Sequence, residues 1–293
     1  MLIFLIILLI GVMFFGYIWW IEPAQVDIEE AAVSLPSPHL RDPVRFLFMS
    51  DIHVGRFTSL RQYRNLFGKI RKHLHDNPPV DAILLGGDLI DSNPAYLPQL
   101  QQVLRELVEW NLPVYAVLGN HDHYAYRRKV KPLVRAMEEA GVTVLRNRAV
   151  PFSAGKSRVL LIGMEELQST DDYNRFFGHL PLDEYVRRAR ALDWYQQFDT
   201  VEVGLPRVMI CHNPDSIYLP GEPRPAVALA GHTHGGQMAF MDWWRNWFFK
   251  PLVPCGSFQT WAGRRLIGQT TLLVSRGLAG ASFPIRFLRK PHV

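Results

Sequence analysis

Cysteine is scarce in this sequence, which holds only Cys211 and Cys255 among 293 residues. Two cysteines exclude a framework of several disulfides, although they leave room for a single bridge. Neither sign of charge dominates, because 32 basic and 27 acidic side chains give a formal net charge of +5. This mild basic excess suits an anionic membrane surface, an anionic substrate or nucleic acid equally well. The length allows one large domain or two small ones.

Charge is missing altogether from residues 1–21. A helix that spans a bilayer needs about 20 consecutive apolar residues, so this segment is long enough. Tyr17, Trp19 and Trp20 lie near its end, as in the aromatic belts of membrane interfaces. A cleaved signal peptide is the alternative, but no basic residue precedes the run and its end lacks a small-residue cleavage site. We therefore predict a single-pass transmembrane anchor at residues 1–21, and the side of the membrane stays open.

The rest of the chain divides near residue 44. Residues 22–43 are acidic at first and then rich in proline and serine, which is typical of a linker. In residues 44–293, apolar runs alternate with helical patterns, which indicates an α/β fold whose strands are buried on both faces. We expect strands at 44–50, 82–86, 114–118, 143–145, 159–163, 207–211, 226–230 and 271–275, and helices at 59–75, 97–110, 128–140 and 183–198.

Side chains able to bind metal follow five of these strands. They are Asp51 and His53, then Asp88, then Asn120, His121 and Asp122, then His212, and last His232 and His234. In α/β folds, ligands bind beyond the carboxyl ends of the strands, where all of these residues fall. Carboxylates and imidazoles are costly to cluster unless a metal or a proton transfer uses them. The pattern therefore indicates a metal centre.

Some of these residues have an ordinary explanation when taken alone. Asp51 and His53 can face one metal from a continuing strand, but a turn aspartate beside a surface histidine explains them equally well. Asp88 can bridge two cations through its two oxygens, or it can cap a helix. His232 and His234, with glycines on both sides, suit a tight loop around two ions and form the strongest signal.

The segment 119–122 offers different chemistry. Asn120 can present an amide oxygen to a metal, His121 can protonate a leaving group, and Asp122 can orient that imidazole. A polar turn is the alternative for this segment. His212 alone would be explained as a structural histidine after a strand, but beside the other histidines it is a candidate ligand.

The ordered series DIH, GGDL, GNHD, CH and GHTHGG resembles the calcineurin-like metallophosphoesterase superfamily, and the resemblance runs through residues 46–237. GHTHGGQ, with SRGL at 275–278 and PIRF at 284–287, is similar to the membrane-anchored bacterial branch. That branch includes YaeI- and YkuE-like phosphodiesterases and LpxG-type UDP-2,3-diacylglucosamine pyrophosphatases. The resemblance implies a four-layer α/β/β/α sandwich at residues 44–293, behind one transmembrane helix in the bacterial inner membrane.

The resemblance also implies a dinuclear metal centre. One ion would be held by Asp51, His53, Asp88 and His234, and the other by Asp88, Asn120, His212 and His232. His121 would be the proton donor or a histidine that contacts phosphate. Mixed oxygen and nitrogen ligands suit Mn, Fe or Zn rather than Ca, and we expect Mn. The implied reaction is metal-dependent hydrolysis of a phosphodiester or pyrophosphate.

Aromatic residues crowd the stretch 238–254, directly after the histidine loop. Trp243, Trp244, Trp247 and Phe248 can share a broad helical face, with basic residues interspersed. Such a composition favours a membrane interface, whereas a core-capping insertion is the alternative. With the anchor, this rim predicts a lipid-linked phosphoester substrate such as UDP-2,3-diacylglucosamine, a lipid A precursor.

Two other functions compete with this prediction. One is a broad-specificity phosphodiesterase or phosphomonoesterase, including a protein phosphatase. The other is a non-catalytic scaffold, against which the intact ligand set argues, because an interaction surface has no need of seven metal ligands. The basic runs at 127–129 and 187–188 lack interleaved aromatics, so we predict no nucleic-acid partner. The sequence indicates no oligomeric state.

Overall fold

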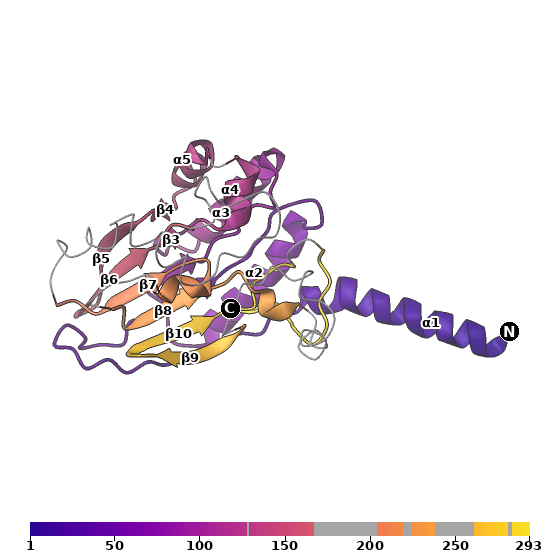
Figure 1. Cartoon of the computed structure of the whole chain (residues 1–293), viewed down its shortest axis with the longest axis horizontal. Helices are drawn as coiled ribbons and strands as arrows, with labels where there is room; N and C mark the ends of the chain where they lie inside the picture. The colour runs from indigo at the N-terminus through magenta and orange to yellow at the C-terminus, as the bar shows by residue number, and fades with distance from the viewer. Residues whose placement is uncertain (128, 167–203, 219–223, 238–260, 281–282) are drawn as a thin grey trace.

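The structure is a computed structural model that describes residues 1–127, 129–166, 204–218, 224–237, 261–280 and 283–293. Two β-sheets and a layer of helices form the body of the molecule, and one long helix projects from it (Figure 1). The expected α/β class is confirmed. The expected helix at 183–198 and the predicted rim residues Trp243, Trp244, Trp247 and Phe248 lie outside the described residues.

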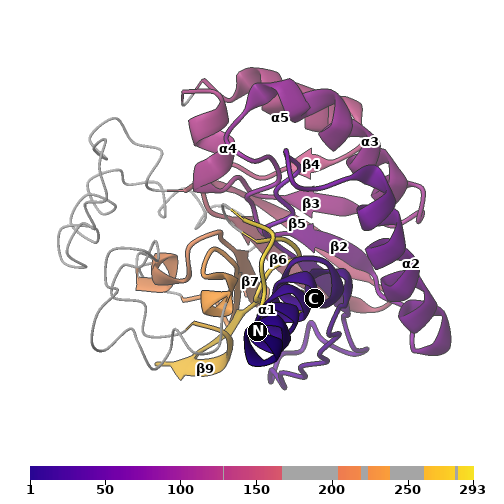
Figure 2. The same ribbon diagram turned by 90° about the vertical axis from the view of Figure 1, so that its right-hand side faces the viewer.

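The first sheet has four parallel strands in the order of the chain. They are β1 (Phe46–Met49), β2 (Ala82–Leu85), β3 (Val114–Ala116) and β4 (Thr143–Val144). Three helices cover its outer face (Figure 2), namely α2 (Leu60–Asp76), α3 (Leu97–Val108) and α5 (Lys131–Glu139). Ser59 caps α2 by accepting a hydrogen bond from the amide of Gln62, which is why this helix begins where the sequence predicts.

The second sheet has six strands in the order β5, β6, β7, β8, β10 and β9. Its parallel centre is β6 (Ser157–Gly163), β7 (Arg207–Ile210), β8 (Val227–Ala230) and β10 (Thr270–Val274), and its antiparallel edges are β5 (Arg148–Ala154) and β9 (Gly263–Ile267). Neither edge strand is among the strands predicted from the sequence. The physical reason is that β9 is largely exposed and β5 contains Pro151, so neither shows the apolar run of a central strand.

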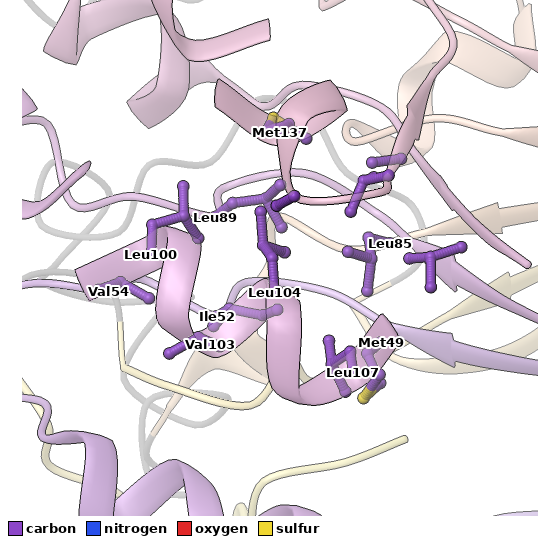
Figure 3. Packing of buried hydrophobic residues seen from close by; sticks show 14 of the residues in the cluster. Met49, Ile52, Val54, Leu85, Leu89, Leu100, Val103, Leu104, Leu107 and Met137 are labelled. Atoms are coloured by element: carbon purple, nitrogen blue, oxygen red, sulfur yellow. The ribbon is translucent and has the colours of Figure 1, made fainter. Parts of the chain in front are cut away.

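Strand β2 shows why the central strands are apolar throughout. Ile83 and Leu85 belong to the core between this sheet and the helices. Figure 3 shows Leu85 in this core with Leu104 of α3. Ala82 and Leu84 point the other way and pack in the layer between the two sheets. The prediction of burial on both faces is confirmed, because alternate side chains of this strand enter different cores.

The N-terminal helix α1 (Leu2–Gly16) continues through a π-helical turn (Tyr17–Ile21) and a 3-10 turn (Glu22–Ala24). The whole helical segment Leu2–Ala24 is long and apolar enough to cross a membrane. Immediately beyond it, Asp27 forms a parallel bridge with His292, and the amide of Glu29 donates to the carbonyl of Val293. The first part of the predicted linker therefore pairs with the C-terminus and holds the end of the helix against the body.

Candidate metal centre

The predicted ligands lie in the segments that follow β1, β2, β3, β7 and β8, at one edge of the two sheets. Several of these segments turn sharply at the ligand itself. The backbone φ angle is positive at Asp51, His53, Asp88, His232 and His234, with values between 47° and 71°. Residues other than glycine seldom adopt this left-handed conformation, and such backbone strain gathers at functional sites.

Asp51, His53 and His234 form the first group, whose ligand atoms all lie within 4.8 Å of one another. Nε2 of His234 lies 3.3 Å from Nε2 of His53 and 3.4 Å from Oδ1 of Asp51. On the other side of the ring, Nδ1 of His234 faces the carbonyl oxygen of Ala279 at 2.9 Å. A carbonyl only accepts hydrogen bonds, so Nδ1 carries the proton and Nε2 turns its lone pair towards the group.

Asp88, His212 and His232 form the second group. Nε2 of His212 lies 3.2 Å from Oδ2 of Asp88 and 3.0 Å from Nδ1 of His232. Oδ1 of Asn120 lies 3.1 Å from the same Nε2 atom. The other ring nitrogen of His212, Nδ1, faces the carbonyl of Gly86 at 2.8 Å, so Nδ1 carries a proton and Nε2 is the nitrogen turned towards the group. A carboxylate, an amide oxygen and two imidazoles thus converge, which are groups that can bind a cation.

Asp88, a member of the second group, also lies close to the first. Its Oδ2 atom is 3.2 Å from Nε2 of His212 and 3.5 Å from Nε2 of His53. Its Oδ1 atom accepts a hydrogen bond of 2.8 Å from the amide of His121. One carboxylate is therefore shared by both sets of ligands, which is the arrangement that a pair of cations requires.

Burial and neighbouring charges set the pKa values of the four histidines in the two groups. Burial, and then the charge of His121, hold the pKa of His53 well below its ordinary value. Burial also lowers the pKa values of His232 and His234. His212 differs, because burial is outweighed there by the carboxylate of Asp88, and the pKa of His212 rises to about 10. Neutral imidazoles are the form that binds metal, and three of the four histidines are held in that form.

His121 lies at the partly exposed side of the centre. Nδ1 of His121 is 2.8 Å from the hydroxyl of Ser92 and 3.5 Å from Oδ1 of Asp91. Burial would lower the pKa of His121, but the carboxylates of Asp88 and Asp91 outweigh it and raise the pKa. Asp91 and Ser92 are not among the site residues predicted from the sequence. Their position could have indicated them, because Asp91 follows Asp88 by only three residues.

Asp122 has a role other than the expected orientation of His121. Its Oδ1 atom accepts hydrogen bonds from the amides of Leu89 and Ile90, at 2.9 and 3.0 Å. Its Oδ2 atom accepts one of 2.8 Å from the amide of Gly119. Both oxygens therefore tie the loop after β2 to the loop after β3, and the imidazole of His121 is held instead by Ser92 and Asp91.

A small pocket opens beside the first group. It is lined by His53, Phe57, Thr58, Asp91, Gly280, Phe283 and Pro284. The ring of Phe57 lies edge-on to that of Trp19, with centroids 6.0 Å apart, and 5.9 Å from the ring of Phe283. Since Trp19 belongs to the end of the N-terminal helix, the pocket adjoins that helix directly.

Comparison with known proteins agrees with this geometry. The sequence profile of the calcineurin-like phosphoesterases matches residues 44–236. The metallophosphoesterase YkuE of Bacillus subtilis is 28% identical over 95% of this chain and 87% of its own length. Phosphodiesterase YaeI of Escherichia coli is 26% identical over 95% of this chain and 90% of its own length. A zebrafish transmembrane protein with a metallophosphoesterase domain is 23% identical over 92% of this chain and 56% of its own length.

The family uses a dinuclear metal centre, and its members hydrolyse phosphoesters. The two groups of ligands and the shared Asp88 carboxylate are what such a centre needs. This chain belongs to the calcineurin-like phosphoesterase family and is a metal-dependent phosphoric ester hydrolase.

Proposed function

We propose that this protein is a membrane-anchored hydrolase that holds two divalent metal ions and cleaves a phosphodiester or pyrophosphate bond of a lipid-linked substrate. The observation that carries the proposal is the contact between Phe57, in the pocket beside His53, and Trp19 at the end of the N-terminal helix. A pocket so close to the anchor would face the surface of the membrane. Strands β7, β8 and β10 point towards the side from which α1 projects (Figure 1).

The residues present fit the metal pair. Asp51, His53 and His234 would hold one ion, His212 and His232 with the amide of Asn120 would hold the other, and Asp88 would be shared. When bound, such a pair of ions acidifies water and polarises the phosphoryl group. Manganese is the proposed metal, with iron or zinc as alternatives, because the ligands mix oxygen and nitrogen.

His121 would deliver the proton to the leaving group. Its Nδ1 atom is held by Ser92 and Asp91, which leaves Nε2 for the substrate. The raised pKa of His121 keeps the imidazole protonated at a higher pH than an ordinary histidine, as a general acid requires. Asp122 supports this geometry indirectly, because it accepts a hydrogen bond from Gly119 at the start of the short helix α4 (Asn120–Ala125), in which His121 lies.

The lipid part of the substrate would lie against apolar side chains at the pocket. Phe57 and Phe283 are 38% and 54% exposed, although large aromatic groups are usually covered. A phospholipid-like molecule at the bilayer surface can reach this pocket without leaving the membrane. UDP-2,3-diacylglucosamine is the specific substrate that we propose. In this proposal, Trp243, Trp244, Trp247 and Phe248 would add further apolar contacts for the lipid.

The test compares two substrates with the full-length protein in liposomes that contain Mn²⁺. We expect a higher kcat/KM on UDP-2,3-diacylglucosamine than on a soluble aryl phosphodiester. Replacement of Trp243, Trp244 and Trp247 by serine should reduce activity on the embedded substrate more than on the soluble one. Equal losses on both substrates would remove the rim from the proposal.

A second variant tests the described part of the pocket. Phe57→Ser should lose activity mainly on the embedded substrate. Leu266→Ser is the control, because it also replaces an exposed apolar side chain by serine, but on the edge strand β9, and it should leave both activities intact. Activity confined to soluble monoesters or phosphopeptides would favour the broad phosphatase alternative. A metal-loaded sample that hydrolyses none of these phosphoesters would favour the scaffold.

A further inference from the structure

Arg286 is the largest fully buried side chain among the described residues. Arginine is almost never fully buried unless its charge and its donors are satisfied. Burial lowers the pKa of Arg286 to about 10, and the carboxylate of Asp51 opposes that effect. The guanidinium is therefore charged at neutral pH, deep in the protein and within electrostatic reach of a predicted metal ligand.

The two terminal nitrogens of Arg286 donate hydrogen bonds to backbone carbonyl groups. Nη2 donates to the carbonyls of Arg276 and Gly277, at 2.8 and 3.0 Å, and also to the carbonyl of Ala279. Nη1 donates to the carbonyl of Arg289 at 2.9 Å. The planar guanidinium thus holds the loop at 276–279 in one conformation. A lysine ammonium group has fewer donors and could not bind all of these carbonyl groups at once.

This loop lies directly on two predicted ligands of one ion. The carbonyl of Ala279, which Arg286 contacts, is the group that faces Nδ1 of His234 at 2.9 Å. The amide of Ala279 donates to the carbonyl of Asp51 at 2.9 Å. Gly277 packs so closely that an added Cβ atom would lie 2.6 Å from Cβ of Asp51. A shift of the loop would therefore move His234 and Asp51 together.

The same arginine is tied to the end of the N-terminal helix. Its backbone amide donates to the carbonyl of Ile18 at 2.9 Å. Three residues later, the amide of Arg289 donates to Oε1 of Glu22 at 2.6 Å. Glu22 is fully buried, and its carboxylate favours the charged form of Arg286. The segment 286–289 thus contacts the end of the N-terminal helix on one side and the loop at 276–279 on the other.

We propose that Arg286 is a positioning residue of the metal centre, which sets the affinity for the ion held by Asp51, His53 and His234 and couples that ion's ligands to the membrane anchor. The inference rests on the two-ion centre of the proposed function and is independent of the lipid substrate. The other ion should be spared, because His212 is oriented by the carbonyl of Gly86, a different segment of the chain.

The test measures metal binding directly. The full-length protein in detergent, stripped of metal, is titrated with Mn²⁺ against a competing chelator, and electron paramagnetic resonance separates single ions from coupled pairs. In Arg286→Met we expect one of the two ions to bind about 10- to 100-fold more weakly, as when other groups that orient metal ligands are lost. The other ion should bind as in the unaltered protein. The resonance signal of a single bound Mn²⁺ ion should therefore persist to higher Mn²⁺ concentrations before the signal of the coupled pair replaces it.

Arg286→Lys keeps the charge and loses the fork, so it should weaken the same ion by a smaller factor. Leu104→Ala, in the core between α3 and the first sheet, is the control for lost stability, since it should lower the melting temperature without selecting one ion. Affinities equal to those of the unaltered protein in Arg286→Met would overturn the proposal, and so would parallel weakening of both ions. If Arg286→Met does not fold, unchanged affinities in Arg286→Lys would overturn it.

Discussion

The Nε2 atoms of His53 and His234 lie 3.3 Å apart, although 181 residues separate the two histidines along the chain. The proton of His234 is on the opposite side of its ring, towards the carbonyl of Ala279. Both rings are buried, and burial lowers both pKa values, so two neutral imidazoles meet beside the carboxylates of Asp51 and Asp88. A shared cation gives these groups the partner that the protein alone does not supply.

The shared carboxylate is the first target for mutation. Asp88→Asn should abolish hydrolysis and reduce bound metal, because it removes the negative charge between His53 and His212. Hydrolysis of an aryl phosphodiester and metal content by mass spectrometry are the measurements. Asp81→Asn is the control, since that carboxylate accepts a hydrogen bond from the amide of Arg45 at the surface. Near-normal turnover in Asp88→Asn would defeat the assignment of this residue as the bridge.

His121 can be separated from the metal ligands by its substrate dependence. His121→Asn should lower kcat by about 10²- to 10⁴-fold on an ester with a poor alkyl leaving group, because proton donation is lost. The loss should be much smaller on a nitrophenyl ester, whose leaving group needs no proton. Metal content should stay at the level of the unaltered protein. A uniform loss across leaving groups, or a loss of metal, would show that His121 is a ligand instead.

Gly231 holds two loops in close approach. A Cβ atom at this position would lie 1.9 Å from Oγ of Ser50 and 2.4 Å from Oδ2 of Asp51, so Gly231→Ala must displace a predicted ligand. We expect loss of bound metal together with lower stability. Gly68→Ala is the matched control, because it meets nothing within 4 Å on the exposed side of α2. That variant should be more stable by about 0.5–1 kcal/mol and keep its metal, as followed by thermal unfolding and metal analysis.

Asp215 predicts a pH dependence of stability. Burial raises its pKa from 3.8 to about 6, so the folded protein binds this proton more tightly than the unfolded chain. Its contribution to stability is complete below pH 3.8 and is lost as the pH rises through about 6. Asp215→Asn cannot ionise and should therefore be more stable than the unaltered protein by about 1 kcal/mol near pH 8, after allowance for partial exposure.

The gain from Asp215→Asn should vanish near pH 4, where the aspartate is protonated in the folded protein. Chemical unfolding of the metal-loaded protein at several pH values is the measurement. A gain that is larger in acid than in base would contradict the assigned direction of the pKa shift.

Local patterns were enough to predict the central strands and the order of the ligands. Strands such as β2 are apolar at every position because their two faces enter two different cores. Edge strands such as β9 carry no such pattern, because exposure lets Arg264 and Arg265 occupy them. Helix α2 was predicted well for a local reason, since its cap Ser59 and its amphipathic pattern lie within the helix itself.

The sequence by itself determined the family, the apolar helix and the segments that carry the predicted metal ligands, since each of these is encoded in contiguous residues. Tertiary structure decided which distant groups meet. It placed Phe57 against Trp19 and Ser92 against His121. It also placed the buried Arg286 against the carbonyl of Ala279, which orients His234. These contacts depend on how separate segments pack, and no periodicity along the chain encodes a hydrogen bond between a side chain and a remote carbonyl group.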